Sequence, residues 1–252
     1  MRVASQRRKH ILTRLRAGTA DVEALSAELG VSASTIRRDL TRLAAEGHVL
    51  RTYGGAAVPE QSVQVRAQEN PREKQAIARL AAQFVQPGET LLLDAGTTTG
   101  ALAAELAARE ALQLHVITNG LTTITALAGV PGVELTVLGG RMRQISFGTV
   151  GPAAEQALRR LTADRVFLGC DGVVAGRGIC EATEAQVCLK ELMIAQAWEV
   201  YVLADASKLG RTASTAWALL PERWTLITDI RATEDQLAPF RACYGVRVLI
   251  AE

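Results

Sequence analysis

Apolar residues in the first sixty positions recur at a spacing that predicts three short helices. They form stripes at helical period over residues 11–15, 22–29 and 36–43. Gly30 is a typical helix terminator, and Ser32, two positions later, is a favoured N-cap residue. A helix, a second helix, a tight turn and a third helix follow one another in the order of a helix-turn-helix unit.

A short alternating segment follows the third predicted helix. Residues 48–53 alternate as in a strand, and Gly54-Gly55 can turn the chain back into residues 56–58. Such a hairpin would be the wing of a winged helix. Its strand would place Arg51 and Tyr53 near a nucleic-acid backbone.

The rest of the chain alternates apolar strands with helical stretches. Strands rich in Leu and Val that alternate with helices predict a parallel sheet covered on both faces. The predicted strands are Thr90–Asp94, Leu114–Thr118, Val133–Leu138, Arg165–Gly169, Val200–Ala204, Thr225–Thr228 and Val246–Ile250, and the helices include Thr98–Arg109, Pro152–Leu161 and Ala182–Trp198.

A polar stretch from Pro59 to Pro71 separates these two regions and has little apolar periodicity, which predicts a linker. The expected fold class is therefore α/β, with an N-terminal winged helix-turn-helix joined to an open α/β sheet domain. The expected division is a head over residues 1–58, a linker over 59–71 and an α/β effector-binding and oligomerisation domain over 72–252.

Composition and charge add a further distinction between the two parts. Apolar residues make up 48% of the 252 positions, so the chain can bury a sizeable core. Residues 1–60 hold ten Lys or Arg and six Asp or Glu, or +4, which leaves eighteen against twenty, or −2, for the rest. A basic head on a slightly acidic body suits a polyanionic partner for the head, although chance produces an excess of this size too.

The cysteines and histidines indicate no metal chemistry. The four cysteines contain no CxxC pair and no histidine lies near them at ligand spacing, so free thiols are expected, and neither a metal site nor a cofactor is. The arginine-rich N-terminus is not followed by the apolar segment of a signal peptide, and no apolar run reaches transmembrane length. The expected compartment is the cytosol.

The third predicted helix has an exposed face with the chemistry of DNA recognition. On a helical wheel, Ser34, Arg38 and Thr41 point away from the apolar stripe, and Arg37 and Arg42 flank them. Guanidiniums and small hydroxyls near a helix N-terminus suit phosphates and guanine edges, whereas an ordinary amphipathic surface helix is the alternative. The candidate DNA-binding residues are Ser34, Thr35, Arg37, Arg38, Thr41, Arg42 and Arg51.

Polar residues follow five of the predicted strands, at the sheet edge where open α/β sheets bind ligands. The Gly96–Gly100 turn offers close backbone approach, helix N-terminal N–H groups and three hydroxyls, so it predicts a phosphate cradle; a plain turn with a Thr N-cap is the alternative. Lys208 and Arg141 would offset phosphate charge.

Four further polar residues at strand ends would bind sugar hydroxyls, namely Asp94, Asn119, Asp171 and Asp205. The more ordinary alternative for Asp94 and Asp205 is a turn or N-cap role, and for Arg141 and Lys190 it is a solvated surface position.

These motifs resemble the DeoR family of bacterial transcriptional regulators across nearly the whole chain. The resemblance is carried in the head by Arg7, Ile11, Leu15, Ser32, Thr35-Ile36-Arg37-Arg38-Asp39-Leu40 and Gly54-Gly55-Ala56, and beyond it by Lys74, Ile77-Ala78, Asp94-x-Gly96-Thr97-Thr98, Thr118-Asn119, Gly139-Gly140, Gly148, Gly169-Cys170-Asp171-Gly172, Lys190 and Asp205-x-Ser207-Lys208. Cys170 stands where the family usually has alanine.

The resemblance implies a C-terminal domain similar to the ribose-5-phosphate isomerase type of fold that senses phosphorylated sugars or related metabolites. The candidate effector-binding residues are Asp94, Gly96, Thr97, Thr98, Thr99, Thr118, Asn119, Gly139, Gly140, Arg141, Asp171, Lys190 and Lys208.

Three functions compete: a sugar-phosphate-responsive DNA-binding regulator, a sugar-phosphate isomerase, and a DNA-binding protein whose second domain only oligomerises. Isomerases of this fold place an acid where this chain has Leu168 and then a lysine-containing loop, whereas residues 173–180 contain no lysine. Binding groups without catalytic groups favour the regulator over an enzyme. We expect a repressor of a carbohydrate-catabolic operon that binds operator DNA as a homo-oligomer, a dimer or tetramer on repeated half-sites.

Overall fold

The computed structural model of the chain describes residues 2–16, 21–46, 49–52, 55–57, 61–109, 112–212 and 214–252, with the backbone alone for residues 2, 3, 50–52 and 55–57. The predicted turn at Gly54, the residue Tyr53 and the side chain of Arg51 lie outside this description.

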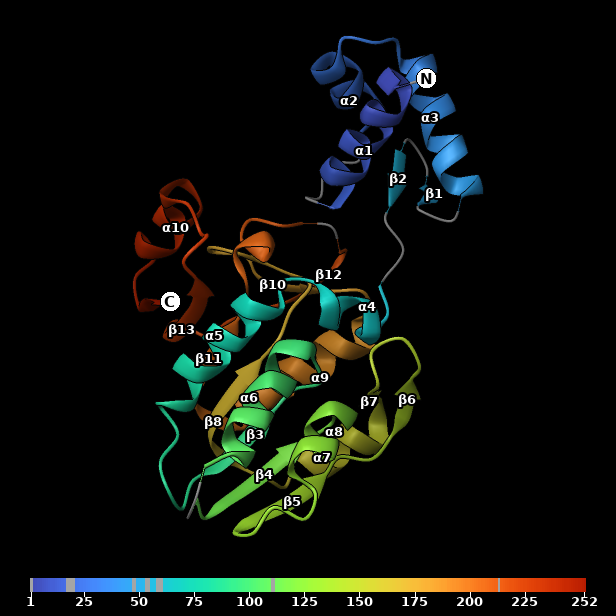
Figure 1. Cartoon of the computed structure of the whole chain (residues 1–252). Coiled ribbons are helices and arrows are strands. Elements are labelled where there is room, and N and C mark those ends of the chain that lie inside the picture. The colour runs from blue at the N-terminus through green and yellow to red at the C-terminus, as the bar shows by residue number, and fades with distance from the viewer. Residues whose placement is uncertain are drawn as a thin grey trace.

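Three helices and a two-stranded hairpin form the head, the smaller body at the top of Figure 1. These are α1 (Arg2–Arg16), α2 (Val22–Leu29), α3 (Ala33–Ala45), β1 (Leu50–Thr52) and β2 (Gly55–Ala57), with β1 antiparallel to β2. All three predicted apolar stripes meet in one buried cluster, in which Ile11, Leu25, Ile36 and Leu40 are fully covered.

Local sequence explains the turn between α2 and α3. Gly30 ends α2 in the left-handed conformation, with φ of 62°, where a side chain would be strained. Ser32 then caps α3, since its hydroxyl accepts a hydrogen bond from the Thr35 amide at 3.3 Å. The predicted helix-turn-helix order and both of its boundary residues are confirmed.

A seven-stranded parallel sheet forms the centre of the larger body. Its strands lie in the order β14 (Val246–Ala251), β13 (Trp224–Asp229), β11 (Ala197–Leu203), β8 (Ala163–Leu168), β3 (Thr90–Leu93), β4 (Leu114–Thr118) and β5 (Val133–Val137). All seven predicted strands are present, and the predicted open α/β fold is confirmed.

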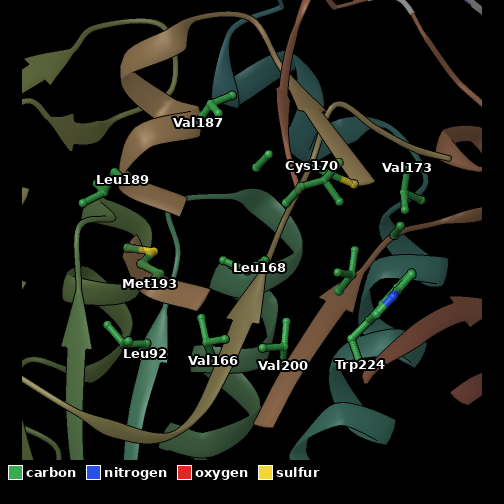
Figure 2. Close-up of a cluster of buried hydrophobic side chains, with 14 of the residues drawn as sticks. Leu92, Val166, Leu168, Cys170, Val173, Val187, Leu189, Met193, Val200 and Trp224 are labelled. Atoms are coloured by element: carbon green, nitrogen blue, oxygen red, sulfur yellow. The ribbon is translucent and has the colours of Figure 1, made fainter. Parts of the chain in front are cut away.

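Helices cover both faces of the sheet. Each strand supplies residues to both faces, because successive side chains point to opposite sides. Leu91 and Leu93 of β3 belong to one buried cluster and Leu92 to the other. The first cluster includes residues of α5 (Pro71–Ala82), α6 (Thr97–Ala107) and α7 (Leu121–Leu127), and the second residues of α8 (Pro152–Leu158), α9 (Glu184–Ala195) and α10 (Glu234–Arg241). Figure 2 shows part of the second cluster, where Leu189 and Met193 of α9 lie over Leu92 and Val166.

The structure differs from the sequence prediction in three places. Short strands add a hairpin, β6 (Arg141–Arg143) with β7 (Gly148–Val150), and a small antiparallel sheet of β9 (Gly172–Val174), β10 (Gly178–Glu181) and β12 (Ala216–Ala218). Strands of three or four residues are too short to show an alternation in the sequence. The helix predicted over Ala182–Trp198 ends at Ala195, because Ala197 already pairs in β11.

The third difference lies in the predicted linker, which is not structureless. A helix, α4 (Val63–Gln68), occupies its centre, and α5 begins at Pro71. Ser62 caps α4 by accepting from the Val65 amide at 3.4 Å, and Val63 is buried. A single apolar anchor gives no periodicity, so this short helix was missed.

No helix in the part of the chain that the structure describes is long and apolar enough to cross a membrane.

Candidate functional site

The centre of the parallel sheet contains a topological switch point. After β3 the chain builds β4 and β5 on one side of it, and from β8 onwards it builds β11, β13 and β14 on the other. The connections therefore leave β3 and β8 in opposite directions, which opens a crevice at their carboxyl ends. Asp94 follows β3 there, and Gly169 follows β8.

A buried lysine bridges this crevice. Lys190 of α9 donates from Nζ to the Gly169 carbonyl at 2.7 Å, lies 3.0 Å from Glu181 Oε1, and contacts Asp94 Oδ2. The Gly169 amide also donates to Asp94 Oδ2, at 3.3 Å. Lys190, Asp94 and Glu181 are each at least 96% buried. The alternative of a solvated Lys190 is therefore wrong.

The three charges of this cluster control one another. Burial alone would lower the pKa of Lys190, but the carboxylates of Asp94 and Glu181 outweigh burial and raise it. Burial raises the pKa of Glu181 to about 8, against the attraction of Lys190. Lys190 is thus held charged, and the carboxyl group of Glu181 takes up a proton at a higher pH than an ordinary glutamate does.

A small pocket opens beside Lys190. Its walls come from β3, β4, the β6–β7 hairpin and α9. The lining residues are Asp94, Ala95, Asn119, Arg143, Ser146, Gly148, Val150, Gln186, Leu189 and Lys190. The structure therefore brings together three of the predicted effector residues, Asp94, Asn119 and Lys190.

Sequence reasoning missed the polar groups that complete this pocket. Gln186 lies one turn before Lys190 on α9 and donates to Glu181 at 2.8 Å; the spacing of four was the available signal. Arg143 donates to the Ser146 hydroxyl at 2.7 Å. No sequence signal identified Glu181 or Arg143, because their strands are too short to recognise.

Two of the predicted residues have their polar groups occupied by the backbone. Thr118 donates to the Leu93 carbonyl at 2.6 Å and accepts from the Gly120 amide. Asn119 accepts from the Ala95 amide at 2.8 Å and donates to the Thr149 carbonyl at 3.0 Å. These bonds fix the ends of β3 and β4 and so shape the pocket.

The Gly96–Gly100 turn leads from β3 into α6 as expected, but its N-cap residue is Gly96 rather than a threonine. Thr98 and Thr99 are buried, whereas Gly96 and Thr97 are partly exposed. Thr99 Oγ1 is buried without a hydrogen-bond partner. Anion recognition at this turn would therefore rest on the first amides of α6 and the Thr97 hydroxyl.

Gly139, Gly140 and Arg141 are exposed and do not line the pocket. Gly140 has φ of 117°, and a Cβ there would lie 2.7 Å from the Val150 carbonyl oxygen. The two glycines follow β5, and Gly140 leads directly into the β6–β7 hairpin, so they shape the approach to Arg143 and Ser146.

A second cationic group lies at the ends of β8 and β11. Lys208 donates to the Cys170 carbonyl at 2.6 Å. Asp205 accepts from the Ser207 amide at 3.1 Å, so the N-cap alternative holds for this residue. Lys74 is buried nearby, and burial together with the charge of Lys208 lowers its pKa to about 8.

The predicted DNA-binding residues of α3 lie together on one face. Ser34, Arg37, Arg38, Thr41 and Arg42 are exposed, and Thr35 is partly exposed. Arg37 and Arg42 lie within 3.5 Å and 3.2 Å of Glu23 and Glu46, respectively.

Asp39, next to this face, points the other way. It is buried and accepts from Arg7 Nε of α1 at 2.5 Å, with Arg8 at 3.7 Å. One half of the Arg38-Asp39 pair therefore faces solvent, while the other half holds the recognition helix against α1.

Together, a winged helix-turn-helix with a basic exposed face and an α/β domain with a polar strand-end crevice define a DNA-binding protein with a separate ligand-binding domain. Family models match both parts: the DeoR-like helix-turn-helix domain over residues 7–62 and the DeoR C terminal sensor domain over residues 69–230. The chain belongs to the DeoR family.

Similar curated proteins cover most of the chain. A protein named as a putative aga operon transcriptional repressor, from Escherichia coli O157:H7, is 36% identical over 98% of this chain and 93% of its own length. The repressor GlcR of Bacillus subtilis is 35% identical over 89% and 87%, and the glycerol-3-phosphate regulon repressor of Escherichia coli K12 is 32% identical over 78% and 79%.

Among solved structures, a ribose 5-phosphate isomerase A from Methanocaldococcus jannaschii is similar with a TM-score of 0.42 and 20% identity, over 56% of this chain and 55% of its own.

Proposed function

We propose that the protein is a transcriptional repressor of a carbohydrate-use operon, and that a phosphorylated sugar or related metabolite controls its binding to DNA. The observation that carries this proposal is the match to named repressors over nearly the full length of both chains. A head matched alone would support DNA binding without sensing, whereas here both parts match.

The names of the relatives support a sugar-linked effector. They include a repressor of the lactose phosphotransferase system, from Lactococcus lactis, and the glycerol-3-phosphate regulon repressor. The crevice of this chain has the corresponding chemistry: the α6 N-terminus, Lys208 and Arg143 suit a phosphate, and the carboxylates around Lys190 suit hydroxyl groups.

In this proposal the second domain binds its ligand without turnover. The Lys190 ammonium is already paired with two carboxylates, and burial raises the pKa of Glu181. A carboxylate that acts as a general base must be ionised, unpaired and within hydrogen-bond reach of the substrate proton. Leu168 supplies none at the end of β8, and Asp171, the acid after it, is paired with Arg66.

We further propose that the repressor acts as a homo-oligomer. A single head offers one recognition helix and one short hairpin, and such a module alone binds DNA weakly. Two heads in one particle on repeated half-sites raise the effective affinity without any new contact.

Two measurements on the purified full-length protein test the proposal. Selection from random DNA duplexes should recover a sequence with repeated half-sites. A thermal-shift panel of sugar phosphates and their free sugars should yield a hit in which only the phosphorylated form stabilises, by about 2.7 kcal/mol at 100 times Kd. Failure to enrich any DNA sequence would contradict the proposal of a transcriptional regulator. Measurable isomerisation of a phosphorylated hit would favour the isomerase alternative instead.

A further inference from the structure

Helix α4 follows the head in the chain and contacts residues at the ligand-binding edge of the sheet. It lies on the larger body, on the side toward the head, and is the first helix after the wing (Figure 1). Arg66, on the last turn of α4, forms an ion pair with Asp171, which lies in the segment after β8. The Nη1 atom of Arg66 is 3.3 Å from Oδ1 of Asp171. The two side chains are only 18% and 16% exposed.

The guanidinium of Arg66 has unused binding capacity at this position. Its Nε is buried and has no hydrogen-bond partner, and only Nη1 contacts Asp171, at a distance that is long for a charged pair. Lys208 is anchored on the Cys170 carbonyl, one residue before Asp171. Arg66 and Lys208 therefore bind neighbouring residues after β8, and a planar guanidinium can bind phosphate through two parallel bonds.

Three more contacts hold α4 against the larger body. The Val63 amide donates to the Ile145 carbonyl at 2.7 Å, and Ile145 precedes Ser146 of the pocket. Lys74 donates to the carbonyl groups of Arg66 and Glu69, the latter at 2.6 Å, and so holds the C-terminal end of the helix. The β6–β7 hairpin and Asp171 are thus both in direct contact with α4.

We propose that Arg66 is an anion-binding residue of the effector site, and that α4 thereby reports occupancy of this site to the DNA-binding head. This inference rests on the proposed function. A ligand phosphate at Lys208 competes with Asp171 for the Arg66 guanidinium. When Arg66 exchanges the carboxylate for the phosphate, α4 moves against its Ile145 and Lys74 contacts, and the head, which precedes α4 in the chain, is repositioned.

The first test needs no ligand. In the full chain, Arg66→Ala and Asp171→Asn break the same contact, whereas Arg79→Ala removes an arginine whose side chain is 65% exposed on α5. We expect both contact variants to speed amide hydrogen exchange over residues 61–70 and to change the Kd for the selected DNA in the same direction, by about fivefold or more. The double variant should change the Kd no further, because one contact is lost only once. Arg79→Ala should match the wild type.

The second test uses inorganic phosphate and glucose 6-phosphate as probes, read by hydrogen exchange at α4 and by thermal shift. Phosphate binding should raise exchange at α4 in the wild type and in Arg79→Ala, and should leave it unchanged in Arg66→Ala. Arg66→Lys, which keeps the charge but loses the fork, takes the place of Arg66→Ala if that variant misfolds.

Equal exchange and equal DNA affinity in Arg66→Ala and Arg79→Ala would overturn the inference, as would additive effects in the double variant. If DNA and sugar phosphate both bind while Arg66→Ala has the exchange rates and DNA affinity of the wild type, the proposed function is supported and the role of Arg66 is contradicted. If no DNA sequence is selected, the proposed function fails, and the exchange measurements still decide whether Arg66 holds α4.

Discussion

Two adjacent residues of α3 separate DNA contact from folding. Arg38 is exposed and forms no ion pair among the described residues, so Arg38→Ala should leave the fold intact and weaken operator binding by about 1–3 kcal/mol per half-site. Asp39→Asn should instead destabilise the head, because Arg7 loses a buried charged partner. Urea unfolding and fluorescence anisotropy on the same two variants measure both effects. Loss of stability in Arg38→Ala, or full operator affinity in a folded Arg38→Ala, would contradict this placement.

A single residue, Glu181, should give the second domain a pH dependence. Its pKa is about 8 in the folded protein, against 4.5 as the ordinary value, so the folded state binds more protons between these pH values. Its contribution to stability is therefore fully present below about pH 4.5 and is lost as the pH rises to 8, with a slope of at most about 1.4 kcal/mol per pH unit.

Urea unfolding of the full chain at a series of pH values measures this effect. In Glu181→Gln the decline between pH 5 and pH 8 should be flatter than in the wild type, because the neutral amide does not titrate. Parallel stability curves for the two proteins would show that Glu181 is ionised throughout.

The turn that begins α6 and the lysine after β11 should recognise the anionic part of the ligand. Thr97→Val and Thr98→Val together, or Lys208→Ala alone, should reduce the thermal shift given by a phosphorylated sugar, whereas the first amides of α6 remain in both variants. DNA affinity without ligand should not change, because these side chains belong to the crevice and not to α3. A full thermal shift in both variants would place the phosphate elsewhere, for instance at Arg143.

At the scale of elements, sequence patterns reveal what repeats and miss what is short. The sheet strands and the three head helices each carry several apolar residues at regular spacing, and all were predicted. The strands β6 and β7 have three residues each and α4 has six, too few for a period, yet these elements bring Arg143 and Arg66 to the crevice. The candidate site was therefore located by its strand ends but only partly assembled.

Lys190 is a residue whose environment the sequence does not predict. A lysine within a helix is usually solvated, and only tertiary structure brings Asp94, Glu181 and the Gly169 carbonyl around it. Gly139, Gly140 and Arg141 show the reverse, since they follow a strand as expected but serve the turn into a hairpin. Position at a strand end identifies the edge of the sheet, not the direction in which each side chain points.

At the scale of the whole molecule, charge divides the chain between two tasks. The +4 of residues 1–60 and the −2 of the remainder predict that salt affects DNA binding through the head. If two heads contact about six phosphates, operator affinity should fall about 10³-fold between 50 and 200 mM salt.

A fragment that starts at Gln61 tests the division between the two parts. It should bind no DNA, whereas a phosphorylated sugar should still raise its melting temperature. Retained DNA affinity in that fragment would contradict the division. Because α4 packs on the larger body, the cut belongs before α4 rather than at Arg72.

The central claim is that one chain converts recognition of a phosphorylated sugar into a change in DNA affinity. The most direct measurement is a titration of labelled, selected operator DNA with the full-length protein, by fluorescence anisotropy, with and without the sugar phosphate that gives the largest thermal shift. The account predicts a change in Kd of about fivefold to 150-fold with the phosphorylated sugar and none with the free sugar. An operator Kd that is the same with saturating sugar phosphate and without it would contradict the claim.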